Sequence, residues 1–276
     1  MKTADAARFV NLGRYPIEDL DSAEYRALVQ RCREQFDDAV SCHLPDFLRM
    51  DAIDAALREI DQKRNLQHLY IQHRGAYNLE DPRTAKHQTA LDPEDARSMP
   101  HRRHQRWIGT DDLSEVCPVK AIYDWPNLTQ FVRDVLDVPE LYTVDDPLMR
   151  VLINVHIQGD ELGWHVDSHD YAVTILLRGA KQGGLYQYVP MTGPGDENYE
   201  YAAKLFEGDV SRVRTVPMGP GSMVIFRGRN TLHRVTPVVD NSQDRVLALL
   251  AYDPVPGRNF GPSFRRNLLN RETPRA

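Results

Sequence analysis

Two stretches near the start of the chain carry apolar residues at helical spacing. Between residues 19 and 40 the apolar side chains recur every three or four positions, and Asp21–Ser22 provides a helix start signal. A second stripe of the same kind predicts a helix over residues 50–62. Both patterns indicate helices that pack one face against a core.

The pattern then changes along the chain. Residues 66–77 are strand-like, whereas residues 79–100 carry Pro, Asp and Ser in the proportions of a loop, and this loop is long enough to act as a lid. A third helix is predicted over residues 131–136. The first 115 residues are therefore expected to form a helical and lid region.

From residue 149 to residue 252 the chain consists of short β-rich runs separated by turn residues, and no helix is expected between them. The runs are MRVLINVHI, WHVD, YAVTILLRG, GGLYQYVP, SRVRTVPM, SMVIFRG, LHRVTPVV and RVLALLAYD. Such a series predicts a sandwich or closed barrel, and a jelly roll fits it best.

Length and composition favour one structural unit. The chain has 276 residues, of which 41% are hydrophobic and 27% charged, as is ordinary for a globular protein. We expect residues 1–115 to pack on a β-rich core of residues 116–256, with residues 257–276 as a C-terminal tail. A homodimer is possible.

Charge and cysteine usage narrow the partners. The net charge of −6 argues against nucleic acid as a partner, so the basic run from His101 to Arg106 is interpreted as a solvated face or a site for one anion. The three cysteines are widely spaced and indicate neither disulfides nor a thiolate zinc site. No signal peptide or apolar run of about 18 residues is evident, which predicts a cytoplasmic protein without membrane contact.

The candidate chemistry centres on His165, Asp167 and His233. In an extended segment, residues two apart point to the same side, so the His165–Asp167 spacing lets one imidazole and one carboxylate converge on one ion. His233, at the start of another strand, supplies a third ligand from across the barrel. Two histidines and one carboxylate on one face of an octahedron leave three positions open, as in non-haem iron(II) oxygenases.

Arg245 follows His233 by 12 residues, on the next predicted strand. Its planar, always charged guanidinium suits a distal carboxylate, although an arginine on a strand is often only a surface salt bridge. Asn154 lies on the strand before His165 and is interpreted either as a hydrogen-bond donor to the inner carboxylate of an oxo acid or as an amide that satisfies a barrel turn.

Long stretches of the chain resemble a known family. They are HRRHQRWIGTDDL, IYDWPNLTQFV, NVHIQGDELGWHVDSHDYAVTILL, GGLYQYVP and ENYEYAAKLFEGDVSRVRTVPMGPGSMVIFRGRNTLHRVTPV. They are similar to the iron(II)- and 2-oxoglutarate-dependent family that contains carrier-independent amino-acid hydroxylases and halogenases, the BesD-like group. The resemblance implies a double-stranded β-helix core (jelly roll or cupin-like, mainly β with some α) with N-terminal helices packed outside.

The resemblance also implies a reaction: oxidation of an unactivated C–H bond in a free amino acid or a close relative, with Fe(II), 2-oxoglutarate and O2. In halogenating members the metal-binding carboxylate position is Gly or Ala, which makes room for chloride, but here it is Asp167. Hydroxylation is therefore expected. The next residue, Ser168, stands where lysine-halogenating relatives carry an acid, which argues against lysine as the substrate.

Substrate contacts are predicted at Arg74, Ser168 and Trp164, with the Arg102–Arg103 pair as an alternative for the carboxylate. These residues also have a purely structural interpretation: an arginine can form a salt bridge, and Trp164 can pack in the core. The rival functions are a non-catalytic jelly-roll protein that binds a metal or small acid, and a 2-oxoglutarate hydroxylase that acts on a protein side chain. A non-catalytic binding protein, however, does not need open coordination positions on a metal next to a fixed cation.

Overall fold

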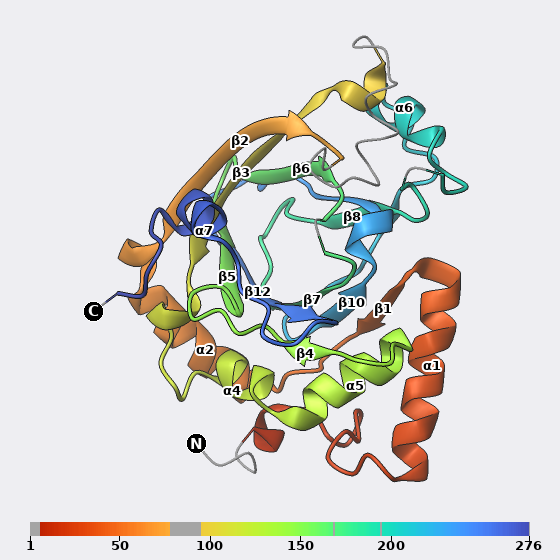
Figure 1. Ribbon diagram of the computed structural model, residues 1–276. Coiled ribbons are helices and arrows are strands. Elements are labelled where there is room, and N and C mark those ends of the chain that lie inside the picture. Colours follow the sequence, from red (N-terminus) through yellow and green to blue (C-terminus); the bar gives the residue numbers. More distant parts are fainter. Residues whose placement is uncertain (1–5, 78–94, 168, 194, 276) are drawn as a thin grey trace.

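The computed structural model describes residues 6–77, 95–167, 169–193 and 195–275, and within these ranges the strands form a curled 11-stranded sheet (Figure 1). Its described pairings are antiparallel. The order is β1-β10-β7-β12-β5-β3-β6-β11-β8-β9, and β2 pairs with β3 outside this path. The strands are β1 (Ser41–Leu44), β2 (His68–Gly75), β3 (Pro100–Ile108), β5 (Val151–His156), β6 (Glu161–His165), β7 (Ala172–Arg178), β8 (Tyr186–Val189), β9 (Arg214–Thr215), β10 (Met223–Phe226), β11 (Leu232–Val235) and β12 (Arg245–Leu250).

The strand order is that of a jelly roll. Consecutive strands β5, β6 and β7 do not pair with one another but with strands far away in the chain, so the backbone crosses repeatedly between the two sides of the curled sheet. A two-stranded ladder of β4 (Tyr142–Thr143) and β13 (Tyr252–Asp253) lies beside the sheet (Figure 1). The predicted mainly β, double-stranded β-helix core is confirmed.

Helices from the first half of the chain cover one outer side of the sheet (Figure 1). They are α1 (Ala23–Ala39), α2 (Met50–Gln62), α4 (Pro118–Tyr123) and α5 (Pro126–Leu136). The hydroxyl of Ser22 accepts from the Tyr25 backbone N–H and caps α1, and α5 begins at Pro126, which has no N–H to leave unpaired. In β5, the alternate residues Val151, Ile153 and Val155 are buried in the same apolar cluster as this helical layer.

The predicted elements are largely confirmed. The helix over residues 50–62 coincides with α2, the stretch 19–40 contains α1, and residues 131–136 form the second half of α5. The strand-like stretch 66–77 contains β2. Seven of the eight β-rich runs contain a strand, and the run WHVD overlaps the end of β6. Most of the lid predicted over residues 79–100 lies outside the described residues.

The basic run His101–Arg106 was interpreted as a solvated face or a site for one anion. It is part of β3, a strand that pairs with β2, β5 and β6, so it is not a solvated face. Its side chains alternate between the two faces of the sheet. Arg106 and His104 contact the buried carboxylate of Asp160 on one face, whereas Arg103 lies on the other. Polar residues on both faces hide the period-two pattern. Residues of the 1–115 segment thus contribute β1, β2 and β3 to the core sheet.

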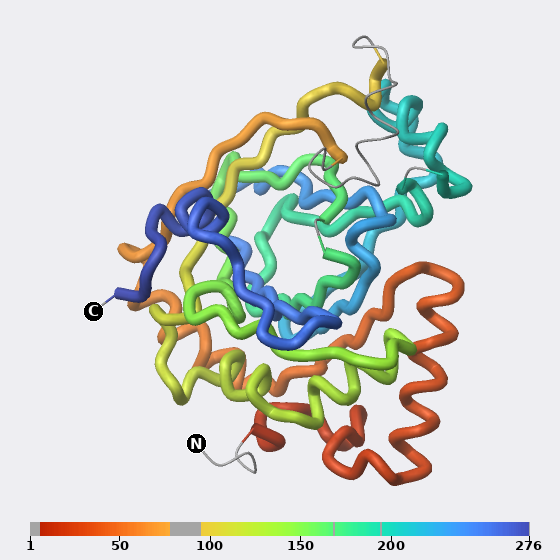
Figure 2. The backbone as a smooth tube through the Cα atoms, viewed as in Figure 1, coloured from red at the N-terminus to blue at the C-terminus, as the bar shows by residue number. Residues whose placement is uncertain are grey.

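The C-terminal segment is ordered and contains α7 (Pro262–Leu269), which lies beside β2 and β3 (Figure 2). Arg265 donates to the fully buried carboxylate of Asp146 at 2.8 Å, and the backbone N–H of Phe260 donates to the same oxygen. A short helix, α6 (Tyr201–Phe206), also interrupts the β-rich half. Among the described residues, no helix is long and apolar enough to cross a membrane.

Candidate metal centre and active-site cavity

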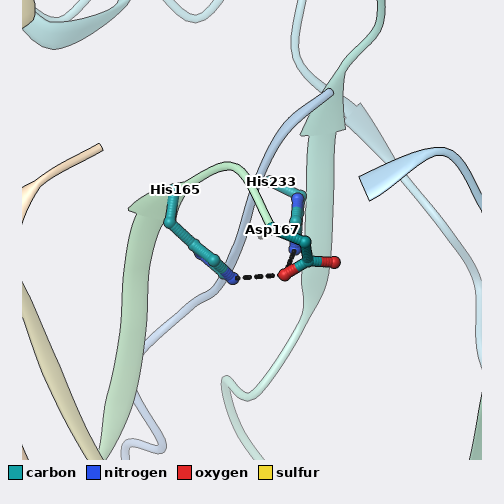
Figure 3. A group of neighbouring side chains, drawn as sticks. All are labelled: His165, Asp167 and His233. Carbon is teal, nitrogen blue, oxygen red and sulfur yellow. Dashed lines mark ion pairs between the residues drawn. The ribbon is translucent and has the colours of Figure 1, made fainter. Parts of the chain in front are cut away.

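Three predicted metal ligands meet inside the curled sheet (Figure 3). His165 ends β6, and His233 on β11 is its direct cross-strand partner, so the two imidazoles lie side by side with ring centroids 4.0 Å apart. Asp167 follows β6 by two residues, and its Oδ1 lies 3.6 Å from Nε2 of His165 and 3.5 Å from Nε2 of His233. Two ligands about 2.1 Å from one ion and at right angles are about 3 Å apart, so this spacing can close on a metal.

The hydrogen bonds of the two histidines fix their free nitrogens. Nδ1 of His165 donates to the Gly163 carbonyl at 2.9 Å, and Nδ1 of His233 donates to the Thr231 carbonyl at 2.8 Å. Because a carbonyl oxygen only accepts, Nδ1 carries the proton and the Nε2 lone pair faces Asp167. Burial, and then the neighbouring His233 and Arg103, hold the pKa of His165 well below its usual value, which keeps the imidazole neutral.

The carboxylate of Asp167 is ionised, and its position is restricted by Gly228. Burial raises its pKa, but the neighbouring His233 and His165 outweigh that effect and bring it to about 2. The Asp167 backbone N–H donates to the Gly228 carbonyl at 3.0 Å, and a Cβ added to Gly228 would lie only 2.7 Å from Asp167 Cγ. Gly228 is a site residue that the sequence analysis missed, since only its contact across the fold reveals it.

The donor set therefore fits a non-haem iron(II) centre. Two imidazoles and one carboxylate converge from one side, and all three donor atoms lie within 4.8 Å of one another. A cavity of about 260 Å³ borders the same three residues, which leaves the opposite side of such an ion open. This volume is near the lower end of small-molecule sites and is too small for a folded partner.

Arg245 lines the same cavity from the start of β12 and is only 3% exposed. Within the described residues, its guanidinium has no carboxylate at ion-pair distance. Burial lowers the pKa of Arg245 to about 10, so the group remains charged at neutral pH. A buried charge without a partner is costly, so the position beside Arg245 in the cavity favours an anion.

Two more arginines line the cavity from the β2–β3 pair: Arg74, which was predicted, and Arg103. Arg103 donates to the Gly75 carbonyl at 3.2 Å, while its buried Nε has no partner within the described part of the chain. The predicted Arg102–Arg103 pair is split, because Arg102 turns outward and donates to the Gly159 carbonyl and to Glu161.

The remaining predicted residues are placed differently. Asn154 lines the cavity, and its Nδ2 donates to Gln105 Oε1 at 3.0 Å and to the Arg106 carbonyl at 3.4 Å. To donate to an oxo acid, Nδ2 would have to give up one of these two acceptors. Trp164 points away from the cavity lining, packs in an apolar cluster and lies under the Arg234 guanidinium. Ser168 lies outside the described residues. Gln105, which the sequence analysis did not single out, also lines the cavity.

A jelly roll that holds two histidines and one carboxylate beside a buried arginine is the architecture of the iron(II)- and 2-oxoglutarate-dependent oxygenases. The Halogenase D family profile matches residues 81–254, which is more than half of the sequence. The chain belongs to the Halogenase D family. This confirms the resemblance that the sequence motifs indicated.

Solved structures share the fold at low sequence identity. An oxidoreductase of the 2OG-Fe(II) oxygenase family from Burkholderia pseudomallei is 16% identical, with a TM-score of 0.50 over 84% of this chain and 93% of the other. The non-haem α-ketoglutarate-dependent epimerase SnoN of nogalamycin biosynthesis is 12% identical, with a TM-score of 0.54 over 82% and 81%. AviO1 from Streptomyces viridochromogenes Tue57 is 15% identical, with a TM-score of 0.52 over 84% and 97%. A search of curated proteins gives no match.

Proposed function

We propose that this chain is an iron(II)- and 2-oxoglutarate-dependent dioxygenase that hydroxylates an unactivated C–H bond of a free amino acid or a similar small molecule. The observation that carries the proposal is one cavity that borders both the His165, Asp167 and His233 cluster and the buried guanidinium of Arg245, which has no carboxylate partner among the described residues. A protein that only binds a metal or a small acid has no need for this combination. Membership of the Halogenase D family supports the same class of chemistry.

The site residues have two separate roles, metal binding and 2-oxoglutarate binding. His165, Asp167 and His233 would hold iron(II) through Nε2, Oδ1 and Nε2, and Arg245 would pair with the 2-oxoglutarate carboxylate farthest from the metal. When bound, iron, 2-oxoglutarate and O2 together supply the oxidant, and succinate and CO2 are released with the hydroxylated product. The protein positions the reactants and excludes water from the cavity.

Asp167 supports hydroxylation in preference to halogenation. Its carboxylate occupies the position facing both imidazoles, and its other oxygen lies against Gly228, so the side chain fills the corner that a halide ligand would need. Arg74 and Arg103 are the cavity cations that remain for the carboxylate of an amino acid once Arg245 is used. The described part of the cavity thus accommodates one dicarboxylic cofactor and one small acid.

The test is a turnover assay with metal-free protein, Fe(II), 2-oxoglutarate and a panel of free amino acids in air. We expect at least one amino acid to stimulate succinate formation and to yield a product heavier by one oxygen. Arg245→Gln should raise the KM for 2-oxoglutarate by about 10- to 100-fold, because it removes a charge-assisted hydrogen-bonding partner. Absence of succinate with every amino acid, together with absence of 2-oxoglutarate binding, would refute the proposed function.

A further inference from the structure

The inner face of the β2–β3 pair changes character along its length. Tyr70 and Arg74 on β2, and Trp107 and Arg103 on β3, all line the cavity. In each strand the aromatic residue and the arginine are four positions apart, which is about 13 Å of extended backbone. One end of this wall is therefore aromatic and the other cationic.

At the cationic end, Arg74 and Arg103 approach each other diagonally across the two strands. Burial, and then the charge of Arg74, lower the pKa of Arg103 to about 10, as expected for two guanidinium groups that lie close together. Within the described residues, Arg74 has no carboxylate partner, and the buried Nε of Arg103 has no acceptor. Two adjacent guanidinium groups with unused N–H donors are suited to a carboxylate.

At the aromatic end, the C-terminal segment closes the cavity with apolar side chains. Phe260 stacks on Phe264 with ring centroids 5.4 Å apart, and both line the cavity opposite Trp107 and Leu152. The segment crosses beside β2 and β3 in Figure 2. His169, two residues beyond Asp167, contacts the edge of Phe260 at a centroid distance of 5.3 Å. This apolar wall therefore borders the candidate metal centre.

The charges of the cavity disfavour a basic substrate. Among the described lining residues, the charged side chains are three arginines and Asp167. Asp167 is directed at the two metal-binding imidazoles, so none of the described lining carboxylates is left for a second ammonium group. Within the part of the cavity that the structure describes, a lysine side chain would lie against Phe260 and Trp107 without a counter-charge, which costs free energy.

We propose that the substrate is a small carboxylate with an apolar body, such as an aliphatic or aromatic amino acid. Its carboxylate pairs with Arg74 and Arg103, and its side chain lies against Trp107, Leu152 and Phe260, next to the metal centre. This inference rests on the proposed function and adds the substrate class to it.

The experiment is a calorimetric binding titration of the full chain loaded with Mn(II) and 2-oxoglutarate, so that no turnover is needed. The ligands are leucine, phenylalanine, lysine, glutamate and leucinamide. We expect leucine and phenylalanine to bind at least about 10-fold more tightly than lysine and glutamate. Leucine should also bind about 10- to 100-fold more tightly than leucinamide, since the amide lacks the charge that the arginines recognise.

Two variants locate the contacts. Arg74→Gln should weaken leucine by about 10- to 100-fold and reduce the difference between leucine and leucinamide, whereas Phe260→Ala should weaken phenylalanine and preserve that difference. Arg102→Gln is the matched control, because Arg102 neighbours Arg103 in sequence but faces outward and contacts Glu161. It should leave all five affinities unchanged.

Several outcomes would overturn the inference. These are lysine binding as tightly as leucine, none of the five ligands binding, or Arg74→Gln weakening leucine and leucinamide equally. Failure of the proposed function looks different: 2-oxoglutarate would not bind to the Mn(II)-loaded protein, or leucine would bind without any succinate formation when Fe(II) and O2 are supplied.

Discussion

Asp167 is positioned by the backbone as much as by the two histidines. Its N–H donates to the Gly228 carbonyl, and its carboxylate lies where a side chain at position 228 would be. The imidazoles of His165 and His233 are oriented separately by the carbonyls two residues before each of them. The ligand geometry is therefore built into the strands before any metal binds, which is how such centres are usually preorganised.

Replacement of Asp167 by Ala removes one of the three metal ligands. Hydroxylation should therefore fall by more than the roughly 10- to 100-fold loss that is typical when a residue that only orients a ligand is removed. Asp170→Asn is the control, because Asp170 is half-exposed and pairs with Arg229. The measurement is product formation per minute at saturating Fe(II). Full activity in the Asp167→Ala protein would show that the ligand assignment is wrong.

Replacement of Gly228 by Ala should act through Asp167. The added methyl overlaps the carboxylate, so we expect the affinity for Mn(II), measured by competition with a chelator, to fall by about 10- to 100-fold while the fold is retained. Gly219→Ala is the matched control, since a Cβ at Gly219 meets nothing within 4 Å. Equal metal affinities in the two variants would contradict this role for Gly228.

At the residue scale, the sequence predicts what local spacing can encode. His165 and Asp167 share one side of an extended segment, and Arg245 follows His233 on the next strand, so these four could be proposed together. Gly228 and Gln105 could not, because their roles depend on contacts between strands that are distant in the chain. Arg103 could be named only together with Arg102, because the sequence did not show which of the two lines the cavity. Trp164 was misplaced for a different reason: adjacent residues on a strand face opposite sides, so Trp164 faces away from the cavity that its neighbour His165 faces.

At the scale of elements, β3 and α7 are two that the hydrophobic pattern of the sequence did not predict. Regular apolar periodicity predicted α1, α2 and the strands of the β-rich half. β3 has arginine or histidine on both faces, because one face binds Asp160 and the other lines a cationic cavity. α7 is short and polar on much of its surface, and its position depends on residues distant in the chain, among them the buried carboxylate of Asp146.

Asp146 is a buried attachment point of the C-terminal segment. Its Oδ1 accepts from the backbone N–H groups of Leu148 and Met149, and its Oδ2 accepts from Phe260 N–H and Arg265. Asp146→Asn removes the buried charge and replaces one of the two acceptor oxygens by an NH2 donor. The free energy of unfolding should therefore fall by about 3 kcal/mol.

Urea denaturation measures this loss. Arg14→Gln, which removes an exposed ion pair with Asp46, serves as the control and should cost less than about 1 kcal/mol. If Asp146→Asn and Arg14→Gln unfold at the same urea concentration, Asp146 does not hold the C-terminal segment in the way described.

On the scale of the whole molecule, the fold class was predictable but the way the sheet is completed was not. The β-rich half predicts a jelly roll by its own pattern. The strands β1 and β3 were not predicted, and β2 was predicted as a strand without a place in the sheet. All three extend the core sheet because a long-range pairing satisfies their backbone groups. Such pairings leave little trace in local sequence.

Because the ligands lie on strands of a complete sheet, the metal-free protein should be folded and should gain stability when the metal binds. At a free Mn(II) concentration of 100 times the Kd, the free energy of unfolding should rise by about 2.7 kcal/mol. For a chain of this size that corresponds to a Tm increase of about 5–10 °C. The same titration of Asp167→Ala should give no shift at that concentration, and an equal shift would mean that the metal binds elsewhere.

The central claim is that O2 supplies an oxygen atom to a small substrate at the His165, Asp167 and His233 centre. The most direct measurement is turnover under ¹⁸O2 with an amino acid that stimulates the enzyme, followed by mass spectrometry of succinate and product. The account predicts equal amounts of succinate and hydroxylated product, with ¹⁸O in both. Succinate without any oxygenated product, or a product whose oxygen comes only from water, would contradict it.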